Sequence, residues 1–178
     1  MGPDSFLDFA EKWQVGVGEL AVSNDPNVVL ATVSLGSCLA ISMYDPAVKV
    51  GGLLRALLPE GRAEPDRAER CPGLFVDTGL AALLRALAPY GVERPRLHVC
   101  LAGAADCLGA GTTFNLGQRN LQTARELLQR YHLPVHAAAV GGVVSRSIFL
   151  DVGTGTVRVF LCGQPTECHT LWSGSTNS

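Results

Sequence analysis

The residue with the clearest chemical potential is Cys38, which follows a Leu-Gly-Ser turn between two apolar runs. A thiol in such a turn can act as a nucleophile once it has lost its proton. Gly36 lets a substrate approach the backbone closely, and the successive N–H groups of Gly36 and Ser37 can hold an oxyanion. The base is less evident, because the next apolar run contains Arg55 and no histidine. The alternative is that Cys38 is a small apolar residue of the core.

The remaining thiols give weaker signals for chemistry. Cys162, Cys168 and His169 resemble part of a metal site, to which Cys100 and Cys107 could add ligands. None of these residues has the CxxC spacing of common zinc sites, so positions in the core or the tail are the simpler interpretation. We therefore predict no metal and no other cofactor. Reduced thiols also fit a chain that is long and apolar enough to need no disulfides.

A glycine-rich stretch, LAGAADCLGAGTTFNLGQRN (residues 101–120), opens into a predicted helix. A helix N-terminus can bind an anion. The stretch matches neither the GxGxxG nor the GK[ST] pattern of nucleotide-binding loops, so a tightly turning loop is the alternative interpretation.

Three apolar runs in the first third of the chain must position Cys38. They cover residues 28–33, 39–44 and 50–58 and are joined by short turns, which predicts an antiparallel meander. Residues 60–72 follow; they are charged, contain two prolines and lack large apolar side chains. This composition predicts a mobile surface loop.

Two helices and further strands complete the predicted order. The first helix has Asp77 or Thr78 as its N-cap, and the second begins at Asn115 and has Pro134 past its end. Further strands are predicted at residues 96–103 and 135–140, with a hairpin formed by residues 147–151 and 156–161 around the VGTG turn. This order predicts one α+β domain, in which mixed or antiparallel sheets form a sandwich-like core packed with two main helices.

The domain is expected to span residues 15–162, between an N-terminal extension (1–14) and a flexible polar tail (163–178). Apolar residues make up 47% of the 178 residues and charged residues 17%, which is enough apolar material for a real core. The formal net charge of −2 provides no electrostatic footprint for nucleic acid or an anionic membrane.

The N-terminal segment has neither a basic start nor a continuous apolar stretch, so we predict no secretory signal. No segment approaches the roughly 20 apolar residues of a membrane-spanning helix. We therefore expect a cytoplasmic protein without membrane insertion.

Three blocks of the sequence carry a resemblance to a known family. They are VGVGELAVSNDPNVVLATVSLGSCLAISMYDPAVKVGGLLRALLP, NLGQRN and VGGVVSRSIFLDVGTGTVRV, in this order. Together they resemble the CheD family of chemotaxis proteins, the chemoreceptor glutamine deamidases. The resemblance covers nearly the whole predicted domain, and it implies a CheD-like cysteine hydrolase fold.

The resemblance implies a hydrolase that converts glutamine side chains on chemoreceptors to glutamate without a cofactor. The nucleophile of the family falls on Cys38 and its catalytic threonine on Thr32. The implied partners are the cytoplasmic domain of a methyl-accepting chemoreceptor and a CheC-type phosphatase.

The chain departs from the family pattern at several places. The histidine of the family's GGxxHxxLP pattern is replaced by Arg55. In the GGxxGR block Ser145 stands in place of the glycine that precedes the arginine, and the family's AGG ends here in Ala104. The matching positions of the NxGxRN and GGxxGR blocks are Asn115, Gly117, Arg119, Asn120, Gly141, Gly142 and Arg146.

The change at Arg55 bears directly on the chemistry. Deamidation requires a thiolate and then a proton for the departing nitrogen, and an imidazole can serve both steps because its pKa lies near neutrality. A guanidinium stays charged and accepts no proton, although a cation near sulfur lowers the pKa of a thiol. Only water or another histidine, such as His98, could then supply the proton, and losing a general acid–base typically costs about 10²–10⁴-fold in rate.

Two hypotheses therefore remain. One is a weakened deamidase that uses Cys38, with Thr32 orienting a replacement base or the substrate. The other is a CheD-like module that binds chemoreceptors or a CheC-type phosphatase without chemistry.

Overall fold

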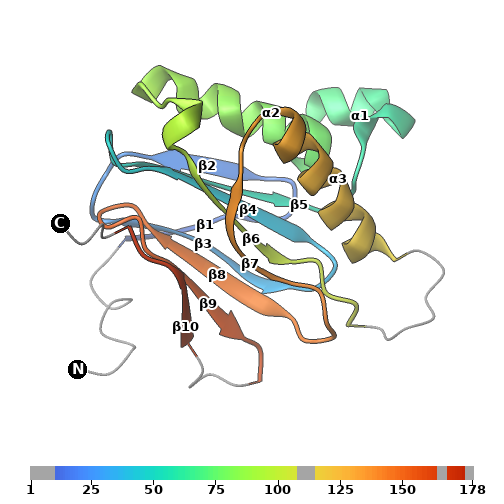
Figure 1. The fold of residues 1–178 in the computed structure, drawn as a ribbon. Coiled ribbons are helices and arrows are strands. Elements are labelled where there is room, and N and C mark those ends of the chain that lie inside the picture. The colour runs from blue at the N-terminus through green and yellow to red at the C-terminus, as the bar shows by residue number, and fades with distance from the viewer. Residues whose placement is uncertain (1–10, 108–114, 164–167, 175–178) are drawn as a thin grey trace.

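The computed structural model describes residues 11–107, 115–163 and 168–174. Two five-stranded sheets pack face to face, and the helices cover the outer face of one of them, so that the protein has three layers (Figure 1). This α+β architecture confirms the fold class predicted from the sequence.

The first sheet forms the outer layer away from the helices. Its strand order is β1-β3-β8-β9-β10, with β1 parallel to β3 and the other pairs antiparallel. The strands are β1 (Glu11–Gln14), β3 (Val28–Leu35), β8 (Arg146–Asp151), β9 (Val157–Leu161) and β10 (Cys168–Trp172). The predicted hairpin around VGTG is confirmed as the β8–β9 pair.

The second sheet is the middle layer. Its strand order is β2-β5-β4-β6-β7, antiparallel except for the β6–β7 pair. The strands are β2 (Leu20–Ser23), β4 (Leu39–Asp45), β5 (Val50–Ala56), β6 (His98–Gly103) and β7 (Val135–Val140). Strand β4 lies at the centre of this sheet and is buried along its whole length, as expected for a strand covered on both faces.

Three α-helices lie along the second sheet and its edges. They are α1 (Pro65–Arg70), α2 (Val76–Leu87) and α3 (Leu116–Arg130). Short 3₁₀ turns join them to the strands: η1 (Gly61–Ala63), η2 (Pro72–Leu74), η3 (Ala88–Tyr90) and η4 (Arg94–Arg96). Among the described residues, no helix has the length and apolar character that crossing a bilayer requires.

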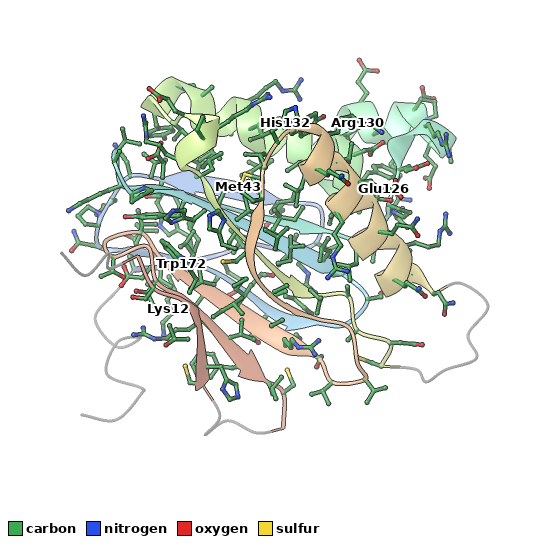
Figure 2. The ribbon with its side chains drawn as sticks, viewed as in Figure 1. Lys12, Met43, Glu126, Arg130, His132 and Trp172 are labelled. Carbon is green, nitrogen blue, oxygen red and sulfur yellow. The ribbon has the colours of Figure 1, made fainter. Side chains whose placement is uncertain are left out.

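The alternation of side chains along β4 divides the core into two parts. Ile41 and Met43 point towards α2 and α3, and Ala40 and Tyr44 point towards the first sheet. Figure 2 shows Met43 beneath the helices, whereas Trp172 lies with the strands of the first sheet. Cys38 belongs to the part of the core between the two sheets.

The predicted antiparallel meander of the first three apolar runs is wrong. Strands β4 and β5 pair as expected, but β3 belongs to the first sheet, where it lies between β1 and β8. Local apolar patterning identifies strands without revealing which sheet each one joins. The consequence is that the turn before Cys38 crosses from one sheet to the other.

The predicted loop at residues 60–72 is also wrong, because this segment contains η1 and α1. Pro65 occupies the first turn of α1. Ala68 is buried against Gly61, where an added Cβ would lie 2.7 Å from the Ala68 methyl group. Helix α2 begins two or three residues earlier than expected, since its N-cap is Phe75 and not Asp77 or Thr78. The Asp77 carboxylate instead accepts the N–H of Gly61.

The ends of the described chain are more ordered than the sequence suggested. The expectation of a frayed tail is wrong for Cys168–Trp172, which pairs with β9, and Trp172 packs against the Tyr44 ring at 6.4 Å between centroids. Glu11–Gln14, assigned to the N-terminal extension, pairs with β3. Residues 1–10, 164–167 and 175–178 lie outside the described residues.

Candidate active site

The turn Gly36–Cys38 joins β3 of the first sheet to β4 of the second. Its three carbonyl oxygens all accept hydrogen bonds. Gly36 O accepts from the N–H of Ala105 and Cys38 O from the N–H of Ala104, both at 2.8 Å. Ser37 O accepts from Nδ2 of Asn120 at 3.0 Å. The N–H groups of the same three residues have no acceptor within the described part of the chain. Three consecutive donors therefore remain available beside the thiol.

Two glycines allow the chain after β6 to lie against this turn. Gly103 has φ +97°, and a Cβ there would collide with Cys38 O. A Cβ at Gly117, in the first turn of α3, would lie 2.7 Å from the carbonyl of Ala104. The backbone of Ala104 is therefore held between the thiol turn and the start of α3.

Thr32, Cys38 and Arg55 converge between the two sheets. Thr32 is fully buried and Cys38 is 6% exposed, and both point into the space between the sheets. Arg55 pairs with Ala40 in the β4–β5 ladder, so it lies diagonally across from Cys38 on the same face of the sheet. Nη1 of Arg55 donates to Oγ1 of Thr32 at 3.2 Å.

Arg55 is anchored to the end of β3. Its Nη1 also donates to Val33 O at 2.7 Å and its Nη2 to Ser34 O at 3.4 Å, while Ser34 adopts φ +54°. Among the described residues, neither Arg55 nor any other group hydrogen-bonds to the Cys38 sulfur, and Nε of Arg55 is buried without a partner. The guanidinium thus hydrogen-bonds both to the Thr32 side chain and to the backbone at the end of β3. It has no lone pair that could accept the proton of the Cys38 thiol.

No histidine takes the place of the missing base in the described structure. His98 was the suggested substitute, but it pairs with Tyr44 at the opposite end of β4, about 20 Å along the strand from Cys38. His136 packs against His98 at 4.6 Å between ring centroids, and His132 follows the end of α3. His169 pairs with β9, three strands away from β3.

A cavity of about 600 Å³ lies beside the turn, on the α3 side. Cys107 and Ser37 are among its lining residues, and the Cys107 sulfur lies 3.7 Å from the position that a Cβ of Gly36 would occupy. Near Cys107, Arg146 donates to Gly141 O at 2.7 Å. Burial lowers the pKa of Arg146, and the nearby Cys107 opposes this effect.

The weaker sequence signals are not brought together. Within residues 11–107, 115–163 and 168–174, no three side chains of His, Cys, Asp and Glu are placed to hold a metal ion, and the six cysteines are free. Most of the glycine-rich stretch considered for anion binding, residues 108–114, lies outside the described residues.

Sequence reasoning gave no role to Asn120, although it noted this residue in the NLGQRN block. Asn120 is fully buried in α3, and its Nδ2 donates to Ser37 O at 3.0 Å and to Leu57 O at 2.8 Å. Two sequence signals could have singled it out: its match to the NxGxRN block, and an amide on the apolar side of an amphipathic helix.

Comparison with known proteins shows a consistent similarity. Residues 57–160 match the family described as CheD chemotactic sensory transduction. The chain is 36% identical over 151 residues to a protein of Syntrophus aciditrophicus named "Probable chemoreceptor glutamine deamidase CheD 1", covering 85% of this chain and 94% of that protein. It is 40% identical over 146 residues to "Probable chemoreceptor glutamine deamidase CheD 2" of Anaeromyxobacter dehalogenans, covering 81% and 92%.

A stretch of 151 residues in this chain necessarily includes Cys38 and Arg55, so the first similarity extends over the candidate site. One solved structure is similar to this chain at a TM-score of 0.45 and 13% sequence identity, the hypothetical protein YfiH of Bacillus licheniformis. The overlap covers 73% of this chain and 58% of the YfiH chain. That overlap is too loose to bear on fold or function.

Proposed function

The chain belongs to the CheD family of chemotaxis proteins, and on this premise we propose that it acts in the cytoplasm on chemoreceptors. It hydrolyses the side-chain amide of receptor glutamines to glutamate through Cys38, at a rate that Arg55 reduces. The observation that carries this proposal is the crossover turn, where three backbone N–H groups that have no acceptor among the described residues flank a thiol.

The proposed reaction follows from this geometry. The Cys38 thiolate attacks the amide carbon, a C–S bond forms, and the carbonyl oxygen becomes an oxyanion that the N–H groups of Gly36, Ser37 and Cys38 stabilise. The C–N bond then breaks as the nitrogen takes up a proton and leaves as ammonia. Water hydrolyses the resulting thioester, which releases the glutamate carboxylate and restores the thiol.

Arg55 explains the reduced rate. All the acceptors that its guanidinium reaches are neutral oxygens of Thr32, Val33 and Ser34, and it cannot transfer a proton at neutral pH. Deprotonation of the thiol and protonation of the leaving nitrogen therefore depend on water. Loss of a general acid–base typically costs about 10²–10⁴ in rate.

A second candidate function is binding without catalysis. The observation that favours it is the absence, among the described residues, of an imidazole near Cys38. In this case the surface around the Gly36–Cys38 turn binds a chemoreceptor or a CheC-type phosphatase, and the Cys38 thiol takes no part in a reaction.

The test measures ammonia release from a chemoreceptor cytoplasmic domain that carries glutamines. We expect the Arg55→His variant to exceed the wild-type rate by about 10²–10⁴-fold, and Cys38→Ala to abolish the reaction in both backgrounds. Arg62→His, at a side chain that is 84% exposed, is the matched control for adding an imidazole and should leave the rate unchanged.

A wild-type rate within tenfold of that of Arg55→His would contradict the proposed impairment. If neither protein releases ammonia while Cys38→Ala still binds the receptor domain in a calorimetric titration, the binding function replaces the enzymatic one.

A further inference from the structure

Asn120 connects α3 to both sides of Cys38. Its Nδ2 donates to the carbonyl of Ser37, which precedes the thiol in the chain, and to that of Leu57. Leu57 directly follows the last residue of β5, Ala56, which pairs with Leu39. A single buried amide thus joins the crossover turn to the chain that leaves β5.

The orientation of this amide is fixed by its partners. Only the NH₂ group of an asparagine can donate to two carbonyl oxygens, so Oδ1 must point elsewhere. Oδ1 of Asn120 is buried and has no hydrogen-bond partner among the described residues. A buried acceptor without a donor is unfavourable, so the helix tolerates an unsatisfied polar atom in order to hold two backbone carbonyls.

The contact with Ser37 O has a consequence for catalysis because a peptide unit is planar and trans. The C=O of Ser37 and the N–H of Cys38 belong to one such unit and point in opposite directions. Fixing the carbonyl against Asn120 therefore fixes the direction of the Cys38 N–H. The neighbouring carbonyls, Gly36 O and Cys38 O, are held by the main-chain N–H groups of Ala105 and Ala104.

We propose that Asn120 is a positioning residue for the oxyanion site: it aims the Cys38 N–H at the oxygen of the substrate. This inference rests on the proposed function, because it assigns the N–H groups of the turn to an oxyanion. It differs from that proposal in naming the one side chain, among the described residues, that hydrogen-bonds to a carbonyl of the turn and so controls the geometry.

The experiment compares two reactions of the same thiol. Acetylation by p-nitrophenyl acetate passes through an oxyanion, whereas alkylation by iodoacetamide does not. Both are followed by mass spectrometry of the Cys38 peptide, so neither requires an intact deamidase or a receptor. The variant is Asn120→Asp, which keeps the shape of the side chain but replaces the NH₂ donor with an acceptor.

We expect Asn120→Asp to acetylate Cys38 about 10–100-fold more slowly than the wild type, since losing one oxyanion donor outright typically costs about 10²–10³-fold. Alkylation should change by no more than about twofold. Gln122→Glu is the matched control: it makes the same amide-to-acid change on the exposed side of α3, where the side chain hydrogen-bonds to Glu126. Both rates should stay at wild-type values in this variant.

If Asn120→Asp does not fold, Asn120→Ser and Asn120→Gln, which retain one or two donor hydrogens, take its place. Recovery of acetylation in Gln relative to Ser, at constant alkylation, would again support the proposal. A parallel fall of both reactions would mean that Asn120 merely supports the fold, and this overturns the inference. Failure of wild-type Cys38 to become acetylated would also overturn the inference. Acetylation that depends on Asn120 without any deamidation would overturn the proposed function alone.

Discussion

The two ends of the β4–β6 strand pair differ in the chemistry that they carry. At one end, where Leu39 pairs with Gly103, lie the thiol turn and its N–H groups. At the other end, where Tyr44 pairs with His98, two histidines and a tryptophan pack together. Within the described residues, one end therefore has the thiol that we propose as the nucleophile but no imidazole, and the other has imidazoles but no such thiol.

The histidine end is built as a packing cluster. The His98 ring lies 4.6 Å from that of His136 and 4.2 Å from that of Trp172, between centroids. Nδ1 of His136 accepts the N–H of Val99 at 3.2 Å. Burial and the nearby His136 lower the pKa of His98, against the opposing effect of Asp45. The lowered pKa favours the neutral form of the His98 ring, and the ring links β10 to the second sheet through its contact with Trp172.

Between the two ends, Cys100 shows what a buried thiol becomes without such a turn. It pairs with Ser42, is 1% exposed and faces the same interior as Cys38. Burial raises its pKa to about 11, although hydrogen bonds from Ser42 and Ala137 oppose the change. Burial in this core therefore makes a thiol inert, and the turn at residues 36–38 is what distinguishes Cys38.

The largest expected effect compares these two thiols directly. At pH 8 iodoacetamide should modify Cys38 at least about 100-fold faster than Cys100, because a thiol with a pKa of about 11 is almost entirely protonated there. Mass spectrometry of the two peptides after timed pulses measures both rates. The Cys100 rate should rise about tenfold per pH unit up to pH 10, provided that the fold is retained.

Exposed Cys71 serves as the internal standard for reagent and pH. Equal rates at Cys38 and Cys100 would remove the distinction between the two thiols.

The sequence predicted local structure better than the relations between distant segments. Most strands and both long helices follow from apolar periodicity, and the β8–β9 hairpin from its glycine turn. The membership of β3 in the first sheet depends on pairing with β8, more than a hundred residues away, which no local pattern contains. The same limit applies to the strand β10 and to the helix within residues 60–72.

For the candidate site, the thiol was evident from its turn, whereas Thr32 and the position of Arg55 came from the family resemblance. Their contact across the two sheets joins residues 23 apart in the sequence, and the contact of Asn120 with Ser37 joins residues 83 apart. Side-chain partners at such separations follow from the packing of layers, which spacing along the chain does not encode.

A stability test sharpens the comparison at the histidine end. The Asp45 carboxylate, at the end of β4, is fully buried and accepts hydrogen bonds from Arg96 and from the N–H groups of Glu93 and Ala47. Burial alone would raise its pKa, but these hydrogen bonds, above all that from Arg96, hold it below the ordinary value. Asp45→Ala removes the acceptor of the N–H groups of Glu93 and Ala47 and leaves Arg96 with Glu93 and Gly91 O as partners. It should cost about 3 kcal/mol in the free energy of unfolding.

Urea denaturation monitored by circular dichroism measures this loss. Glu64→Gln, which removes an exposed i,i+3 ion pair with Arg67, is the control and should cost less than about 1 kcal/mol. A loss of the same small size for Asp45→Ala would show that the histidine end is not anchored through this carboxylate.

The smallest expected effect is the pH dependence of the histidine cluster. Because the folded pKa of His98 lies below its unfolded value of about 6.5, the unfolded chain binds more protons as the pH falls through that value. Stability should therefore decline between pH 7 and pH 5, by at most about 1.4 kcal/mol for each unit by which the two pKa values differ. His98→Gln should flatten this part of the urea-denaturation profile, whereas His132→Asn, at an exposed position with φ +56°, should leave it unchanged.

Trp172 fluorescence, read in a Trp13→Phe background, reports whether protonation loosens β10 before global unfolding. An equal pH slope in wild type and His98→Gln would mean that the histidine end contributes packing alone, and that neutrality of its rings is incidental to the fold.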